Sequence, residues 1–380
     1  MGNADLDFVV PAGWDDASHP SGGNIYDQFL TAEMEQLGWD VRMRPVSGPW
    51  PRPAHQGLRE LATTLESVPD GGRVLLDGLV ACGVPEVLAA HHQRLRLTVL
   101  VHLPLSAESG LDPQTAKDLD QAEREALGYA RMVVATSRWT ADHLTSRHGV
   151  PGDRVHIAVP GVRPGAVGTG SPSTNRHLLC AASLTPRKGH ETLVRALAAV
   201  PRELPWELHI AGAQPDPAYR DRLLALIAES DLGDRITLLG PLDRTAMTSD
   251  YRWADLLVLA SEQEAYGMCV TEALAHGVPV YASDTGGIGE ALGYSSFLES
   301  VEPERPGRLL PVGDATAWAS ALLEWMTQLQ LRDRLLTLAE ERQRTLPTWR
   351  ATALDVCAAV RGYHPRPTTA DTVHAREIPA

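Results

Sequence analysis

The chain is poor in cysteine and has no long apolar run, and each shortage excludes a class of protein. The four cysteines stand far apart among 380 residues, at Cys82, Cys180, Cys269 and Cys357, so we predict neither a disulfide framework nor a CxxC site. No run of about 18 apolar residues occurs, so we expect no integral membrane segment. The first residues, MGNADLDFVV, lack a basic leader before an apolar core, so we expect no signal peptide and a cytoplasmic location.

Positive charge is also in short supply. Lysine and arginine number 34 against 48 aspartates and glutamates, which gives a net charge of -14 and a pI near 5.4. Such a surface repels phosphate backbones and anionic lipids, so we expect no nucleic-acid partner. A local basic pocket can still bind one diphosphate. The composition leaves the oligomeric state open.

The sequence is rich in short apolar runs that alternate with amphipathic segments, as in Leu6–Pro11 followed by the helical pattern of Ile25–Leu37. The alternation stops at the Pro/Gly/Ser-rich stretch Pro160–Thr174 and then restarts. A length of 380 residues also exceeds what one core usually holds. We therefore predict an α/β protein of two Rossmann-like doubly wound domains that face an interdomain cleft. The expected segments are a domain over 1–160, a linker over 161–175, a domain over 176–346, a helix over 347–362 that packs back on the first domain, and a flexible tail over 363–380.

The most specific motif is Ser261–Glu272, SEQEAYGMCVTE. Glu264 and Glu272 have seven residues between them and follow an apolar strand, and Gly267 then opens a helix. The free N–H groups at that helix start suit a phosphate, and carboxylates accept hydrogen bonds from vicinal hydroxyls. Taken alone, the spacing also fits two unrelated surface glutamates.

The longer block from Trp253 to Glu290 resembles the retaining enzymes of glycosyltransferase family 4, which have the GT-B fold. The matching residues are Asp255, Ser261, Glu264, Gly267, Glu272, Ala273, Gly277, Pro279, Gly286, Gly287 and Glu290. The resemblance implies transfer of a sugar, with retention, from a nucleoside diphosphate sugar to a hydroxyl of an acceptor. A UDP- or GDP-sugar is the expected donor, and a soluble small molecule or glycan the expected acceptor. The first domain would bind the acceptor and the second the donor.

The segment Ala182–His190, ASLTPRKGH, resembles the pyrophosphate-binding segment of the same family. Lys188 matches its lysine, a point charge suited to phosphate, and Arg187 is the neighbouring cation. The sequence departs from the family at Ser183, where many members carry an arginine. A solvated surface lysine is the alternative interpretation of Lys188.

Two features of the first half also match the family. Gly22 and Gly23 correspond to a glycine loop after the first strand, where backbone amides can approach a phosphate or the acceptor. His102 ends the strand Leu97–Leu103, and a histidine at a comparable strand end contacts the donor sugar in the family. An ordinary turn and an ordinary core or loop histidine are the alternatives.

The resemblance therefore implies a set of site residues and no bound cofactor or metal. The catalytic set is His102, Lys188 and Glu264, and the donor-binding set is Gly22, Gly23, Arg187, Lys188, Glu264, Gly267 and Glu272. We find neither an HExxH motif nor a close His/Cys cluster in the sequence, and we interpret the Asp-x-Asp triplets at 5–7 and 118–120 as incidental. We expect no metal, with fixed positive groups neutralising the leaving diphosphate.

Three other functions fit parts of the pattern. The glycines of Thr285–Glu290, TGGIGE, invite comparison with a dehydrogenase fingerprint, but their spacing is wrong and they come late in the chain. An epimerase or phosphorylase of the same fold would use similar residues. A non-catalytic nucleotide-sugar-binding subunit is favoured by Ser183 and opposed by Lys188 and the two glutamates.

Overall fold

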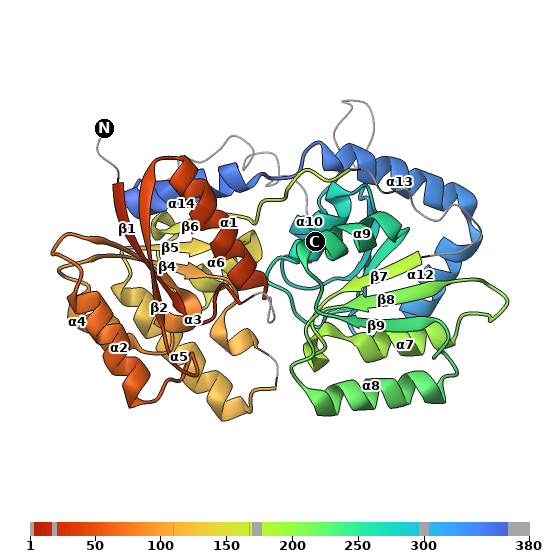
Figure 1. The fold of residues 1–380 in the computed structure, drawn as a ribbon, viewed down its shortest axis with the longest axis horizontal. Coiled ribbons are helices and arrows are strands. Elements are labelled where there is room, and N and C mark those ends of the chain that lie inside the picture. Colours follow the sequence, from red (N-terminus) through yellow and green to blue (C-terminus); the bar gives the residue numbers. More distant parts are fainter. Residues whose placement is uncertain are drawn as a thin grey trace.

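The computed structural model describes residues 4–16, 21–108, 110–166, 168, 177–295 and 304–363. They form two α/β domains that stand side by side (Figure 1). The first domain contains β1 (Ala4–Pro11), α1 (Gly22–Gln36), β2 (Trp39–Val46), α2 (His55–Glu66), β3 (Arg73–Asp77), α3 (Gly78–Ala81), α4 (Pro85–His91), β4 (Arg96–Val101), the 3-10 turn η1 (Leu105–Ala107), α5 (Pro113–Tyr129), β5 (Met132–Ala135), α6 (Arg138–Ser146), η2 (Gly152–Arg154) and β6 (Val155–Ile157).

The second domain repeats the alternation and ends with a helix that returns to the first. Its elements are β7 (His177–Ala181), η3 (Pro186–Lys188), α7 (His190–Ala198), β8 (Glu207–Ala211), α8 (Pro217–Glu229), β9 (Ile236–Gly240), α9 (Arg244–Trp253), β10 (Leu256–Leu259), α10 (Met268–Ala275), β11 (Val280–Ser283), α11 (Ile288–Leu292), β12 (Gly307–Leu310), α12 (Ala315–Thr327) and α13 (Leu329–Gln343), followed by α14 (Trp349–Arg361). Among the described residues no helix is both long enough and apolar enough to span a bilayer.

The two sheets are parallel throughout but differ in strand order. The first sheet runs β2-β1-β3-β4-β5-β6, and the second runs β12-β11-β10-β7-β8-β9. In such sheets ligands bind beyond the carboxyl ends of the strands, where the direction of winding reverses. The reversal lies between β1 and β3 in the first domain and between β7 and β10 in the second.

Burial explains the apolar strand sequences. All four residues of β10 are buried, as are the last five of β4, because helices cover both faces of each sheet. The second domain has one large core, whereas the first has a separate core on each face of its sheet.

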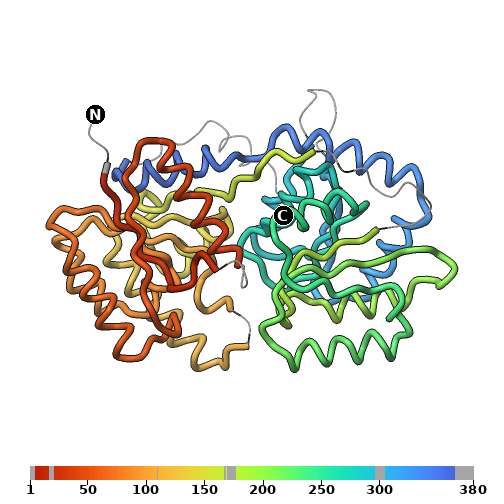
Figure 2. Tube along the Cα trace, viewed as in Figure 1, coloured from red at the N-terminus to blue at the C-terminus, as the bar shows by residue number. Residues whose placement is uncertain are grey.

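The chain crosses between the domains twice, at neighbouring positions. Val162 on the way out forms a β-bridge with Thr348 on the way back. A Cβ on Gly161 would lie 2.1 Å from the backbone nitrogen of Trp349, so the two crossings pack backbone against backbone. After the return, α14 lies along the first domain (Figure 2). Its residues Trp349 and Val356 join the core formed by β1 and α1.

Several boundaries differ from those expected. Helix α1 begins at Gly22 rather than Ile25, because Ser21 Oγ accepts a hydrogen bond from Asn24 N at 3.1 Å and caps the helix there. The sequence over 315–346 predicts a helical stretch, and the structure has two helices there, divided at Gln328. Of the predicted linker only 161–166 and 168 are described, and of the predicted tail only Tyr363.

Candidate active site

The second domain contributes an ion pair at its reversal of strand order. Lys188 ends η3, which follows β7, and Glu264 lies in the loop after β10. Lys188 Nζ and Glu264 Oε1 are 2.5 Å apart. Gly189 has a φ of +65°, and a Cβ there would lie 1.9 Å from the carbonyl oxygen of Ala260, so glycine lets η3 pack against the end of β10.

The surroundings of Glu264 keep it ionised although it is buried. Burial acts to raise the pKa of this carboxyl, but Lys188, and then Arg187 and the hydroxyl of Ser261, outweigh it and hold the pKa below its usual value. Ser261 Oγ donates to Glu264 Oε1 at 2.8 Å. The pair thus presents a fixed cation beside a fixed anion at neutral pH.

The loop that carries Glu264 rests on the glycine turn Gly286–Gly287. Gly286 has a φ of +56°, and a Cβ there would lie 1.7 Å from the carbonyl oxygen of Glu264. Gly287 N donates to that oxygen at 3.1 Å. The Gly-Gly turn seen in the sequence therefore positions the glutamate.

Arg187 turns toward the same carboxylate. Its Nη1 donates to the carbonyl oxygen of Gln263 at 2.8 Å and lies 3.9 Å from Glu264 Oε2. Its Nε lies 3.3 Å from Oε1 of Glu108, which belongs to the first domain. Arg187 therefore brings a second positive charge to the site, although Ser183 has replaced the arginine expected from the family.

Helix α10 begins at the same place. Gly267 precedes it with a φ of +92° and offers no side-chain cap, which leaves the first amides of the helix available to an anion. Glu272 lies in the second turn, partly buried, and accepts a 2.7 Å hydrogen bond from Tyr251 Oη. Burial raises the pKa of Glu272 while the bond from Tyr251 opposes the shift.

The first domain places His102 and the two N-terminal glycines opposite. His102 follows β4, and its Nε2 lies 3.0 Å from Oδ1 of Asp27 on α1. A Cβ on Gly23 would come within 3.2 Å of the His102 ring, and a Cβ on Gly22 within 3.9 Å of Met268 Sδ on α10. The N-terminus of α1 therefore meets the N-terminus of α10 across the domain boundary, and the glycines lie in a helix start rather than in the loop predicted.

A further contact joins the domains. Glu290 Oε2, at the start of α11, accepts a 2.7 Å hydrogen bond from the backbone nitrogen of Arg138, at the start of α6. Burial raises the pKa of Glu290. This bond and the pair of Glu108 with Arg187 hold the two halves of the site against each other.

The structure thus brings Arg187, Lys188 and Glu264 into one cluster, with Gly267 and Glu272 on the adjoining helix. Gly22, Gly23 and His102 lie on the facing domain, and no direct side-chain bond joins His102 to Glu264 among the described residues. Four residues of the site have no role predicted from the sequence: Asp27 and Asp77 beside His102, and Glu108 and Tyr251 near the second domain's cluster. Asp77 ends the short apolar run 73–77, which is a usable signal in the sequence, whereas Asp27 is hidden within a helical pattern.

The sequence has no close His/Cys cluster, but the fold brings two histidines and an aspartate together. In the part of the chain described, a carboxylate oxygen of Asp120 and one ring nitrogen each of His143 and His148 lie within 4.8 Å of one another. Asp120 lies on α5, His143 on α6, and His148 just after α6. Asp120 Oδ1 already accepts from Arg147 Nε at 2.8 Å and faces His148 Nε2 at 3.3 Å. These neighbours already balance the carboxylate, and we assign no metal there. Asp27, Asp77 and His102 form the other such group.

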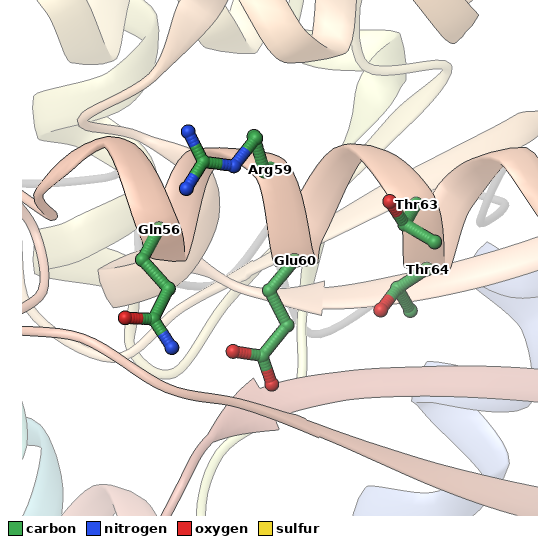
Figure 3. A pocket seen from close by; sticks show the side chains of 5 residues that line it. All are labelled: Gln56, Arg59, Glu60, Thr63 and Thr64. Carbon is green, nitrogen blue, oxygen red and sulfur yellow. The ribbon is translucent and has the colours of Figure 1, made fainter.

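One surface depression lies elsewhere. It is lined by Gln56, Arg59, Glu60, Thr63 and Thr64, all from α2 (Figure 3). Side chains from a single helix face cannot enclose a nucleotide, and Lys188 and Glu264 are not among them. This depression has no part in the site.

The comparisons with known proteins agree with this geometry. Residues 167–342 match the family model described as glycosyl transferases group 1. The chain is 26% identical over 255 residues to the D-inositol 3-phosphate glycosyltransferase of Jonesia denitrificans, covering 62% of this chain and 58% of that protein. It is 28% identical over 284 residues to that of Paenarthrobacter aurescens, covering 71% and 65%. The chain thus matches less than two thirds of the length of these relatives.

Solved structures extend the likeness to both domains. A sucrose-phosphate synthase from Thermosynechococcus elongatus superposes with a TM-score of 0.76 at 22% identity, covering 94% of this chain and 98% of that one. The Anabaena protein HepE, in complex with UDP and glucose, gives a TM-score of 0.72 at 16% identity, covering 94% and 100%. The predicted fold is confirmed, because the chain has the two-domain GT-B fold of these neighbours. The match of residues 167–342 to the glycosyl transferases group 1 model supports the resemblance seen in the sequence.

Proposed function

We propose that the protein is a retaining glycosyltransferase that moves a sugar from a nucleoside diphosphate sugar to a hydroxyl of an acceptor without a metal ion. The observation that carries the proposal is the bond between Lys188 and Glu264, set where the strand order of the second sheet reverses. A UDP- or GDP-sugar is the proposed donor. A soluble small molecule or glycan is the proposed acceptor, the cytoplasm the proposed location, and no cofactor is required.

The positive groups suit the leaving diphosphate. As the bond at the anomeric carbon breaks, negative charge grows on the phosphate oxygen, and fixed donors that stabilise such charge supply a large part of catalysis. Lys188, Arg187 and the first amides of α10 lie on one side. The amides at the start of α1 face them, because Gly22 lies close to Met268. This set of donors does the work that a divalent cation does in other transferases.

The carboxylates suit the hydroxyls of the donor. Glu264 is ionised and beside Lys188, so when the lysine turns to the diphosphate the carboxylate becomes free to accept from the sugar hydroxyls. Glu272 accepts a hydrogen bond from Tyr251 and lies one helical turn beyond the first residue of α10. We assign to it the binding of the ribose hydroxyls. His102 on the facing domain donates to the sugar from the other side. Among the described residues we assign no carboxylate as a nucleophile, so we favour displacement on one face, with a phosphate oxygen taking the acceptor proton.

The two relatives named above are D-inositol 3-phosphate glycosyltransferases, and HepE was solved with UDP and glucose. These relatives support a nucleotide-sugar donor and a polyol acceptor class for this chain.

The test is a melting-temperature panel of UDP-, GDP-, ADP- and dTDP-sugars, followed by transfer assays with the nucleotide sugar that binds. A ligand that binds only the folded state raises the melting temperature. We expect sugars of one nucleotide class to raise the melting temperature. We also expect transfer to continue in EDTA, and proton NMR of the product to show that the anomeric configuration of the donor sugar is retained. Donor binding without transfer to any of a panel of polyol and sugar acceptors contradicts the proposal, as does epimerisation of the donor without an acceptor.

A further inference from the structure

Asp27 is a buried carboxylate that the chemistry above does not use. It lies in the second turn of α1 and its exposed fraction is 0%. Burying an ionised carboxylate costs several kcal/mol unless it is paired. Its Oδ1 lies 3.0 Å from Nε2 of His102, which is 75 positions away in the sequence. Burial raises the pKa of Asp27, and His102 is the partner whose charge and hydrogen bond oppose that rise and favour the ionised carboxylate.

A second carboxyl completes the bonding of Asp27. Asp77, at the end of β3, is 3% exposed, and its Oδ1 accepts from Leu79 N at 2.7 Å. Ligand atoms of Asp27, Asp77 and His102 all lie within 4.8 Å of one another. Oδ2 of Asp27 is buried with no donor among the described groups, so a proton on Asp77 would supply the missing bond. Burial, and then the charge of Asp27, raise the pKa of Asp77 to about 7.

The same carboxylate sets the charge of His102. Burial acts to lower the pKa of this imidazole, but the charge and hydrogen bond of Asp27 outweigh it. The charge of Asp77, once that carboxyl has lost its proton near pH 7, adds to the rise, and the pKa of His102 reaches about 9. As an imidazolium, His102 has two N–H donors. Nε2–H is committed to Asp27. Nδ1–H has no protein partner among the described residues, and the exposed fraction of the His102 side chain is 19%.

Neighbouring groups hold the ring in one orientation. The Tyr26 ring contacts His102 edge-on at 5.1 Å between centroids, and its hydroxyl donates to the carbonyl of Ala158 at 2.9 Å. Thr136 Oγ1 donates to the carbonyl of His102 at 3.1 Å. Asp355 on α14 acts on Tyr26 and not on His102. The titratable groups that face the pair are therefore Tyr26 and Asp77.

We propose that Asp27 is a positioning residue that holds His102 as an imidazolium and presents its Nδ1–H as the donor to the bound sugar, with protonated Asp77 completing the bonds of Asp27. The proposal rests on the function proposed above. It also resolves a conflict of charge, because an imidazolium alone would repel an oxocarbenium-like transition state. The pair of Asp27 and His102 is neutral overall and still donates a strong hydrogen bond.

The direct test is an NMR titration of histidine Cε1 signals in the full chain, with His102→Gln used to assign the signal. We expect His102 to titrate near pH 9 in the parent protein and more than one pH unit lower in Asp27→Asn. Asp77→Asn, whose amide can still donate to Asp27, should give a smaller shift. Asp355→Asn is the matched control and should leave the signal unchanged. Titration of parental His102 near its ordinary value overturns the proposal, even if Asp27→Asn does not fold.

The kinetic test separates positioning from general damage. In Asp27→Asn the basic limb of the kcat profile should move down by more than one pH unit, while the melting temperature and donor KM change little. An equal loss of kcat at every pH overturns the proposal, and so does a His102 signal that shifts with EDTA or added Zn²⁺. If parental His102 titrates as expected but no nucleotide sugar is consumed, the proposed function fails and the charge state assigned to His102 stands.

Discussion

The two halves of the candidate site differ in how they carry charge. In the second domain Lys188 holds the pKa of Glu264 below its usual value, so this carboxylate is ionised at neutral pH, and Arg187 adds a further cation. In the first domain Asp77 and His102 have pKa values of about 7 and 9, so that half changes its protonation within the physiological range and just above it. In the function proposed above, the first of these groups is a fixed clamp for a diphosphate, and the second is a titrating donor for the sugar.

They differ also in how they are assembled. The clamp comes from two loops at the ends of β7 and β10, and a glycine turn fixes its glutamate. The donor comes from the helix α1 and from the ends of β3 and β4, joined through buried polar contacts. A clamp made from contiguous motifs depends on local backbone shape, whereas a donor made from distant elements depends on the packing of a whole domain. The predictions below test that contrast.

The largest effect is expected for Lys188→Met. Loss of one preorganised charge at a leaving group lowers turnover by about 10²–10³-fold. The change also leaves Glu264 buried without its main partner, and breaking a buried pair costs about 3–5 kcal/mol. The measurements are kcat with the identified donor and the free energy of unfolding in urea. The double variant Lys188→Met/Glu264→Gln should recover part of the stability but none of the turnover; full activity in Lys188→Met would contradict the clamp.

A smaller but diagnostic effect is expected for Gly286→Ala. The new Cβ meets the carbonyl oxygen of Glu264 at 1.7 Å, so the loop that carries the glutamate must shift. Gly313→Ala is the matched control, because Gly313 has a φ of +72° with no atom within 4 Å of a Cβ. Left-handed backbone alone costs an alanine about 1–2 kcal/mol. Gly286→Ala should lose more stability than the control, and only Gly286→Ala should lose donor affinity; equal losses would show that the turn does not position Glu264.

The same contrast explains what the sequence could predict. The glutamate spacing, the lysine segment and the Gly-Gly turn are local patterns, and the family resemblance that they carry predicted Glu264, Lys188 and Arg187 as members of one donor-binding set. Asp27 could not be found that way. It occupies a buried position of α1 where helical periodicity gives no warning of a charge, and its partner is 75 residues away.

The fold was predictable at the level of alternating strands and helices but not at the level of strand order. The first sheet reverses between β1 and β3 and the second between β7 and β10, although the two halves read alike in sequence. Strand order depends on which neighbours pair in space, and apolar runs of similar length do not encode it. The start of α1 was misplaced for a local reason, since the capping hydrogen bond of Ser21 outweighs the low helix propensity of Gly22 and Gly23.

A modest effect is expected for Tyr251→Phe. Its hydroxyl donates to Glu272 Oε2 at 2.7 Å, and loss of such a bond leaves a partly buried carboxylate less well held. We expect a loss of about 1 kcal/mol in the free energy of unfolding and a rise in donor KM of a few fold, with kcat nearly unchanged. Calorimetric unfolding measures the change in the free energy of unfolding, and initial rates give KM and kcat. A fall in kcat with KM constant would show that Glu272 acts in the chemical step rather than in binding the nucleotide.

The smallest effect is expected for Arg59→Ala, in the depression on α2. The five side chains that line it come from one helix, and it lies on neither half of the site (Figure 3). Exposed substitutions of this kind change stability by less than about 0.5 kcal/mol. We expect donor affinity, kcat and KM to equal those of the parent protein within error. If Arg59→Ala raised the KM of an acceptor while leaving donor affinity intact, acceptor binding would extend over α2, and the first domain would have a second region of function apart from His102.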